Sequence, residues 1–339
     1  MATIEYRGKN WNAEKRYEPS SIANILYKGA DAVERKISDR LAENSAFKPV
    51  GTLIPFESFT RDLTTAGTYQ VGEGVDTSNF FGALTAKSTV LKAGAKTVIY
   101  PFGNQNITGL ESPAIIKWVT ENERLTEVPD PVFRAVAMSP KMCSISIKIG
   151  RQLMVQSSFE LDRVIKAEIT RALSLEIDRV CLNGLSASNE PMGLMNCSDI
   201  VTDTTAEMSY ANIVDMAGNI DDLNANINGL SLITTPLVKR DMLKTFRNPN
   251  SGDTPVWCGI PDMKFLATKN MPLNGAFHSA IMGDFSNLVI GFWGQMIDII
   301  VDNYTYSSES ATRIVGRTMI DIGIIHPESF RKTNTIALI

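Results

Sequence analysis

The clearest hydrophobic pattern in the chain predicts one long amphipathic helix over residues 157–183. Ser157 and Glu160 have the spacing of a capping box, which fixes the start of a helix, and Gly184 is a typical terminator. Apolar residues recur between them at three- and four-residue intervals, as Leu161, Val164, Ile165, Ile169, Ala172, Leu173, Ile177, Val180 and Cys181. At 1.5 Å per residue the helix is a rod of roughly 40 Å, long enough to act as a strut.

Upstream of this rod, the pattern predicts an N-terminal helix followed by short strands. Residues 1–18 are polar and of mixed charge, whereas residues 20–44 carry an apolar stripe at helical spacing and charged residues elsewhere. Such a helix needs a surface to pack on, either its own subunit or a neighbour. Residues 50–59 and 90–102 are apolar runs among Gly-, Thr- and Asn-rich turns, so we predict strands and loops there.

Residues 112–140 have the pattern of a long polar hairpin. Residues 115–119 suggest an outgoing strand and residues 132–138 a returning one, with charged residues and two prolines between them. A two-stranded ribbon in water buries too little surface to be stable alone, so its order must come from another surface. The alternative is a flexible surface hairpin whose charges are solvated. The charged residues of this segment are Glu121, Glu123, Arg124, Glu127, Asp130 and Arg134.

The second half of the chain alternates helical and strand patterns, which favours a mixed α/β arrangement. We predict helices over 210–223 and 236–246 and strands over 230–235, 265–268, 296–302 and 311–325. Residues 248–253 form a strong turn signal. A polar turn containing Ser307, Ser308, Glu309 and Ser310 separates the last two strands.

Composition indicates a globular protein with a substantial core: 339 residues, 44% of them hydrophobic and 21% charged. No apolar run is long enough for a membrane span, and the first residues lack a signal-peptide pattern, so we expect synthesis in a cytosol and no membrane partner. The four cysteines are too far apart for a zinc motif or a disulfide framework. A net charge of −4 lacks the basic excess of a protein that grips nucleic acid, although it is compatible with a container that must release its contents.

Candidate catalytic and metal-binding residues are few. His278 and His326 are the only histidines, and neither has a matched nucleophile pattern nearby. The pairs Asp221–Asp222 and Asp298–Asp302 lack the dense oxygen ligands of a calcium loop. The glycines at 72 and 74 do not complete a phosphate-binding motif. We therefore expect no enzyme, no metal and no cofactor.

Several blocks in sequence order resemble the major capsid proteins of tailed bacteriophages, which have the Hong Kong 97 fold. They span about residues 80–330. The blocks are residues 133–142 and 147–154, Leu182-Asn183-Gly184 with Glu190-Pro191-Met192-Gly193, Gly259-Ile260-Pro261, Met282-Gly283-Asp284-Phe285-Ser286 and residues 317–330.

The resemblance implies an α+β Hong Kong 97-like fold with an N-terminal arm, an extended β-hairpin loop, a peripheral domain built on a long spine helix, and an axial domain. The implied boundaries are 1–56 for the arm and its amphipathic helix, 57–111 for peripheral strands and loops, 112–140 for the extended loop, 141–200 for the peripheral domain with the spine helix, 201–290 for the axial domain, and 291–339 for peripheral strands and the C-terminus. The arm helix is either a docked helix or a remnant of an assembly-guiding region. Since no room for a longer such region exists unless residue 1 is a processing product, a separate scaffolding protein is expected.

By the same resemblance, the protein self-assembles into pentamers and hexamers of an icosahedral shell that encloses double-stranded DNA. The extended loop lies over a neighbouring subunit, with the six charged residues of 112–140 available for intersubunit charge pairs, and the turn at 307–310 faces a three-fold contact. Expected partners are further copies, a portal protein, a scaffolding protein, a decoration protein and DNA held by confinement; the expected location is the virion, after assembly in the bacterial cytoplasm. Some relatives join subunits through a lysine of this loop and an asparagine, but here no lysine lies between Lys117 and Lys141 and residues 309–310 carry no amide, so we expect no cross-link. Two alternatives remain: an encapsulin-type nanocompartment holding cargo enzyme, and a soluble α/β enzyme with a concave site.

Overall fold

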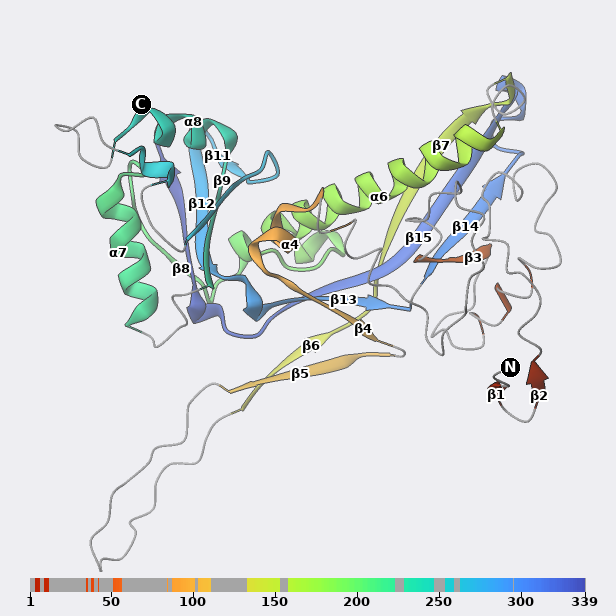
Figure 1. Cartoon of the computed structure of the whole chain (residues 1–339), viewed down its shortest axis with the longest axis horizontal. Coiled ribbons are helices and arrows are strands. Elements are labelled where there is room, and N and C mark those ends of the chain that lie inside the picture. Colours follow the sequence, from red (N-terminus) through yellow and green to blue (C-terminus); the bar gives the residue numbers. More distant parts are fainter. Residues whose placement is uncertain are drawn as a thin grey trace, which may run out of the picture.

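Two β-sheets, a projecting two-stranded hairpin and one long helix make up the computed structural model (Figure 1). The structure describes residues 4–6, 9–11, 35, 38, 39, 42, 51–56, 84, 87–100, 103–110, 133–152, 158–222, 229–246, 254–258, 263–294 and 296–338. At the N-terminus, β1 (Ile4–Tyr6) and β2 (Lys9–Trp11) form a small antiparallel pair. In the described part of the chain, no helix combines the length and apolarity that crossing a bilayer requires.

The first sheet, called here the long sheet, has the strand order β3-β14-β15-β13-β4, with β7 also paired to β15. Its strands are β3 (Thr52–Pro55), β4 (Lys96–Tyr100), β7 (Lys141–Gly150), β13 (Leu288–Trp293), β14 (Met296–Asp302) and β15 (Ala311–Ile324). Alternating burial along β7 turns Cys143, Ile145 and Ile147 towards the core and the residues between them towards solvent.

The rod α6 (Ser158–Asn183) lies along β7 and β15 (Figure 1). Its buried residues Ile165, Ile169, Leu173 and Ile177 share one core cluster with the inward residues of the long sheet. The helix is 26 residues long, which at 1.5 Å per residue is about 39 Å. This confirms the predicted rod over the residues that the structure describes; the expected cap, Ser157, lies outside them.

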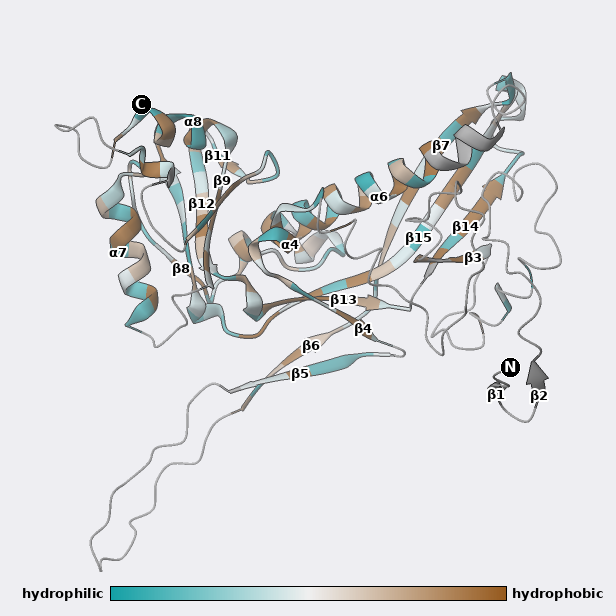
Figure 2. Ribbon diagram, viewed as in Figure 1, coloured by the Kyte–Doolittle hydropathy of each residue, from teal (hydrophilic) through white to brown (hydrophobic). Residues whose placement is uncertain are grey.

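The second sheet, called here the compact sheet, has the strand order β10-β9-β12-β16-β8, with β11 paired to β12. Its strands are β8 (Val201–Thr202), β9 (Leu230–Thr234), β10 (Lys264–Ala267), β11 (Leu273–Asn274), β12 (Phe277–Asp284) and β16 (Phe330–Ile336). Helices α7 (Tyr210–Asp221) and α8 (Pro236–Lys244) flank it (Figure 1). All of β9 is buried, and three of its five residues are apolar, Leu230, Leu232 and Ile233 (Figure 2).

Short 3₁₀ turns connect these elements. They are η2 (Ser186–Ser188), η3 (Leu194–Asn196), η5 (Val256–Cys258), η6 (Phe285–Asn287), η7 (Ser307–Glu309) and η8 (Pro327–Ser329). The turn η6 carries the chain directly from β12 of the compact sheet into β13 of the long sheet.

The helix α4 (Thr89–Ala93) corrects the prediction of strand and loop from residue 90. Ser88 caps its start and Gly94 ends it, so only β4 remains of the expected strand. Asp178 of α6 holds this start in place: it accepts hydrogen bonds from Ser88 Oγ at 2.6 Å and from the backbone N–H groups of Thr89 at 2.8 Å and Val90 at 3.0 Å. A buried carboxylate at a helix N-terminus satisfies donors that the helix leaves unpaired.

The predicted bounds of β14 are confirmed, and those of α7, β9, α8, β10 and β15 are confirmed within two residues. The strand β3 covers four residues of the predicted run 50–59, of which residues 57–59 lie outside the described part of the chain. Residues 330–336 were expected with the strands of 291–325, but β16 pairs with β12 and β8 in the compact sheet. The predicted turn at 248–253 and most of the predicted helix at 20–44 lie outside the described residues.

Candidate assembly surfaces

The projecting hairpin is formed by β5 (Gln105–Leu110) and β6 (Phe133–Met138), which pair antiparallel from Gln105 opposite Met138 to Leu110 opposite Phe133. The returning strand confirms the prediction at 132–138. Its partner, however, is β5, whereas the predicted outgoing strand at 115–119 lies outside the described residues.

The two faces of this hairpin differ. On one face, Val136 and Met138 turn inwards, and Met138 is fully buried. On the other face, Ala135, Ala137 and Phe133 are exposed, and Phe133 is 67% exposed. A large apolar side chain this exposed, on a strand that leaves the body of the molecule (Figure 1), is a candidate anchor for another protein surface.

A charge pair ties the hairpin to its own chain. Arg134 Nη2 donates a hydrogen bond to the Asp199 carboxylate, which also accepts from Ser198 Oγ. The Arg134 hydrogen bond is the main cause that lowers the pKa of Asp199, and the pKa of Arg134 is raised in turn. The other five predicted contact residues of the hairpin, Glu121, Glu123, Arg124, Glu127 and Asp130, lie outside the described residues.

The turn between β14 and β15 is the second candidate surface. Asp302 accepts hydrogen bonds from the Tyr304 N–H at 2.9 Å, the Thr305 N–H at 3.0 Å and Arg313 Nη2 at 2.7 Å, and from the Thr305 hydroxyl. These bonds, the Thr305 hydroxyl foremost, lower the pKa of Asp302 well below its usual range. Tyr304 is held by this turn with 88% of its surface exposed.

The predicted residues of this turn are all exposed. Ser307, Ser308 and Glu309 form η7, and Ser310 follows in the left-handed conformation at φ 50°. Glu309 pairs with Lys148 of β7, whose ammonium also lies 4.6 Å from the centre of the Tyr306 ring. The turn is thus attached to the end of β7, and Glu309 has a partner that the sequence did not reveal.

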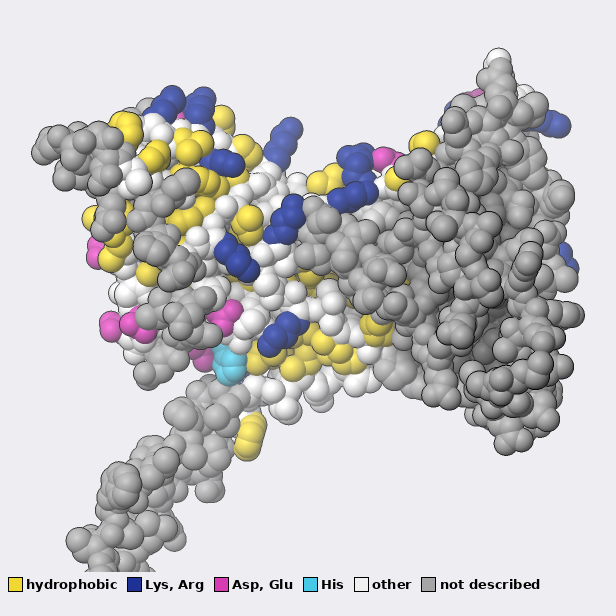
Figure 3. Space-filling view, in the orientation of Figure 1, with side chains coloured by type: hydrophobic (Ala, Val, Ile, Leu, Met, Phe, Trp, Pro, Cys, Tyr) yellow, Lys and Arg dark blue, Asp and Glu magenta, His cyan; other side chains and the backbone are white. Residues whose placement is uncertain are grey.

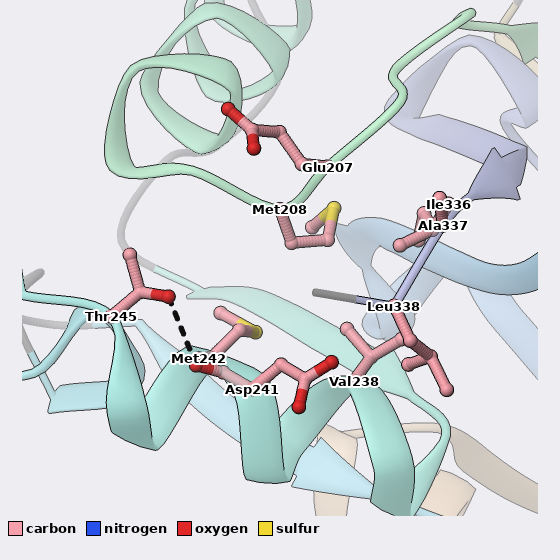
Figure 4. A pocket seen from close by; sticks show the side chains of 9 residues that line it. All are labelled: Glu207, Met208, Val238, Asp241, Met242, Thr245, Ile336, Ala337 and Leu338. Carbon is pink, nitrogen blue, oxygen red and sulfur yellow. Dashed lines mark hydrogen bonds between the residues drawn. The ribbon is translucent and has the colours of Figure 1, made fainter.

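A groove of about 470 Å³ runs between α6 and the strands β7 and β15. Aliphatic side chains of α6 and of the long sheet are part of its lining, together with Glu176 and Glu190, which both pair with Arg179, at 2.7 Å and 2.8 Å. Glu190 belongs to the loop after α6, so the pair fastens that loop to the helix. A smaller pocket of about 10 Å³, lined by Met208, Val238 and Met242 among others, has room for about one water molecule (Figure 4).

The candidate chemical residues do not gather into a site. His278 is buried and its Nδ1 lies 3.0 Å from the hydroxyl of Thr235, the residue that caps α8. His326 faces Glu328 at 3.7 Å. Among the described residues, no three His, Cys, Asp or Glu side chains are grouped in a way that would hold a metal ion. Basic side chains on the face shown in Figure 3 are spread out singly or in small groups.

Comparison with known proteins decides the family. The model of the phage capsid family matches residues 67–335. The chain belongs to the phage capsid family. The major capsid protein of Halomonas phage phiHAP-1 is 25% identical over 320 residues, covering 92% of this chain and 52% of that protein. The major capsid protein of Klebsiella oxytoca phage phiKO2 is 22% identical over 278 residues, covering 72% of this chain and 63% of that protein. The chain therefore spans only about half to two thirds of the length of these relatives.

Solved phage capsid structures share the fold of this member of the family. The capsid of a native GTA particle aligns with a TM-score of 0.58 at 13% identity, covering 81% of this chain and 96% of that one. The chain from Gordonia phage Cozz aligns with a TM-score of 0.54 at 12% identity, covering 82% and 92%. The chain from the procapsid of satellite phage P4 aligns with a TM-score of 0.51 at 12% identity, covering 77% and 100%. These likenesses are consistent with the expected α+β, Hong Kong 97-like class.

Proposed function

We propose that this protein is a structural shell subunit that self-associates into pentamers and hexamers of an icosahedral capsid around double-stranded DNA, and that it acts without a catalytic site or a cofactor. The observation that carries the proposal is the hairpin, which has one anchored face and one exposed face that ends in Phe133. Family membership supports it, because the matched relatives from Halomonas and Klebsiella phages are named major capsid proteins.

In this proposal each part of the molecule has a mechanical role. The hairpin and the loop beyond it lie across a neighbouring copy, with the charged residues at 121, 123, 124, 127 and 130 available for the contact, whereas Arg134 is paired with Asp199 of its own chain. The turn at 307–310 meets its equivalents at a three-fold contact, and the compact sheet with α7 and α8 faces the axes of the rings. The long sheet and α6 connect these contacts as the peripheral domain, and the N-terminal residues reach another copy.

The partners follow from the same role. Further copies of the chain form the wall, a portal protein occupies one vertex, a scaffolding protein guides assembly, a decoration protein binds outside, and the DNA is held by confinement. Subunits hold together without a lysine–asparagine cross-link. Assembly takes place in the bacterial cytoplasm and the product is the virion.

Phe133→Ala tests the proposal. An exposed side chain contributes little to the stability of the free subunit, so we expect its unfolding free energy to change by less than about 0.5 kcal/mol. Assembly, in contrast, depends on buried anchors at the contact. Electron microscopy of the expressed wild type is expected to show closed particles or ring-shaped capsomers, and the variant should lose most of them.

Leu175→Ala is the matched control, because Leu175 is an apolar residue on α6 that is 43% exposed, and the proposal gives it no part in a contact between subunits. The control should assemble like the wild type. The proposal fails if the wild type stays monomeric at high concentration with a scaffolding protein present, or if Phe133→Ala assembles normally. Particles that co-purify with an enzyme and without nucleic acid would instead indicate the nanocompartment alternative.

A further inference from the structure

At the root of the hairpin, where β6 joins the long sheet, one side chain fits closely between two strands; this position is called here the Met138 seat. Met138 ends β6 and is fully buried. It lies against two glycines of the long sheet, Gly291 on β13 and Gly323 on β15. A Cβ atom on Gly291 would come within 2.9 Å of Met138 Cε, and one on Gly323 within 3.0 Å of Met138 Sδ. Real Cβ atoms essentially never approach another atom within 2.9 Å, and 3.0 Å is tighter than nine in ten real contacts, so a side chain at either position would require Met138 to shift.

A single carboxylate binds the chain on both sides of the corner that follows. Ser139 and Pro140 connect β6 to β7. Asp321 of β15 accepts a hydrogen bond from the Ser139 N–H at 2.8 Å and another from Lys141 Nζ at 3.1 Å. Asp321 is only 3% exposed and, in the sheet, is paired with Gly291. The same strand, β15, therefore supplies both the seat for Met138 and the acceptor for the corner.

The geometry of the corner leaves it little freedom. Pro140 has a fixed φ and no N–H, so the corner has few backbone torsions and donors of its own. A charge-assisted hydrogen bond to a buried carboxylate is stronger and better oriented than one to solvent. The six residues of β6 span about 20 Å, so a rotation of about 10° at the root would move its far end by about 3 Å. That displacement is the length of a hydrogen bond.

We propose that Met138 and Asp321 form a latch that fixes the direction in which the hairpin leaves the body, and that this direction sets the angle between neighbouring copies. The second half of the inference rests on the proposed shell function, whereas the first half concerns the free subunit alone. Met138 and Asp321 are positioning residues here, since both act on the hairpin and need not touch the neighbour.

Asp321→Ala tests the latch in the free subunit by hydrogen exchange. Loss of the acceptor should raise the exchange rate in residues 133–139 by about tenfold or more. Asp298→Ala is the matched control: Asp298 is 2% exposed in the long sheet and accepts a backbone bond from Gly51 at 3.0 Å. Its effect should be confined to β3 and β14. Unchanged exchange in residues 133–139 of Asp321→Ala overturns the latch, whatever the particles do.

Gly323→Ala tests the seat for Met138 independently if Asp321→Ala does not fold. Its added methyl displaces Met138 and should raise exchange in the same residues. Gly316→Ala is its control on the same strand, because a Cβ there would come equally close, 3.0 Å, to Ile145 Cγ2 and does not touch Met138. Equal exchange at the hairpin in both alanine variants would contradict the seat.

The claim that the hairpin direction sets the angle between neighbouring copies is tested by the size and shape of the assembled particles. If the latch sets the angle between copies, Asp321→Ala or Gly323→Ala should give particles of broadened diameter or open sheets by electron microscopy, whereas both controls give the wild-type distribution. Wild-type diameters in a variant whose hairpin exchange has risen would overturn this half. Absence of particles in the wild type would instead contradict the proposed function and leave the exchange result standing.

Discussion

Replacing Asp178 of α6 by alanine should lower the unfolding free energy of the subunit more than most single substitutions in the long sheet and α6. Asp178 is 1% exposed and is the common acceptor for the Ser88 hydroxyl and for two backbone N–H groups at the start of α4. The substitution leaves two buried donors, the Ser88 hydroxyl and the Val90 N–H, and the part-buried Thr89 N–H without their partner. Each unsatisfied buried donor costs about 1–3 kcal/mol. We therefore expect a loss of about 4 kcal/mol.

The measurement is urea unfolding of the free subunit, monitored by far-UV circular dichroism. Asp199→Ala is the comparison, because Asp199 also accepts from a side chain of another element but is 46% exposed, so it should cost less than about 1 kcal/mol. Ser88→Ala removes the cap and one of the three bonds, and should cost about 1–2 kcal/mol. Since the two residues share a bond, the double variant should cost less than the sum of the single ones.

Two results would refute this reasoning. A loss in Asp178→Ala no larger than in Asp199→Ala would mean that water replaces the carboxylate at the start of α4. Strict additivity of the Ser88 and Asp178 substitutions would mean that the two side chains do not act on the same helix start.

Three further predictions concern other parts of the chain. Burial raises the pKa of the Cys143 thiol to about 11, so at pH 8 its alkylation, followed by mass spectrometry of the peptide, should be on the order of a hundredfold slower than that of a free cysteine; a rate near that of free cysteine would contradict this. Gly184→Ala should prevent soluble expression or lower the unfolding free energy, measured in urea, by more than about 3 kcal/mol, because a Cβ at this position would collide with the carbonyl oxygen of Pro191. Wild-type stability of this variant would show that the turn after α6 can move to make room. Arg134 lowers the pKa of Asp199, so the stabilisation from their pair is complete above the unfolded pKa of about 3.9 and is lost as the pH falls through the lower folded pKa. Amide hydrogen exchange in β5 and β6, corrected for the intrinsic rate, should therefore not change between pH 7 and about pH 5. A rise in the corrected rate near pH 6 would contradict the pairing of Arg134 with Asp199.

Local patterns were sufficient to predict the elements whose signals lie within themselves. The rod α6 has a periodic apolar stripe and a glycine terminator, and β14 and β15 are segments rich in isoleucine and valine on either side of a polar turn. The helix α4 was mispredicted because five residues are too few to show a helical period, and its stabilising partner, Asp178, lies 89 residues away from Thr89. The sheet to which β16 belongs was also beyond local reasoning, since a strand pattern does not specify its partner.

The same distinction applies to the candidate surfaces. A loose alternation of polarity predicted the returning strand at 132–138, and the charges and prolines before it predicted a hairpin tip, yet the partner strand β5 has a mixed polar sequence with no strong alternation. The partners of Arg134 and Glu309 are Asp199 and Lys148, which are distant in sequence. The glycines that contact Met138 gave one available signal, since Gly291 lies inside the otherwise apolar strand β13 and Gly323 between two isoleucines of β15, and a glycine inside a strand can mark close approach of another group.

The most direct test of the account is a cryo-electron microscopy map of the assembled protein in which the hairpin can be traced. We predict that the strands β5 and β6 leave the body at the Met138 seat and that the chain beyond Phe133 lies across an adjacent copy. A map in which the hairpin is folded against its own subunit, or in which Phe133 faces solvent in every copy, would contradict it.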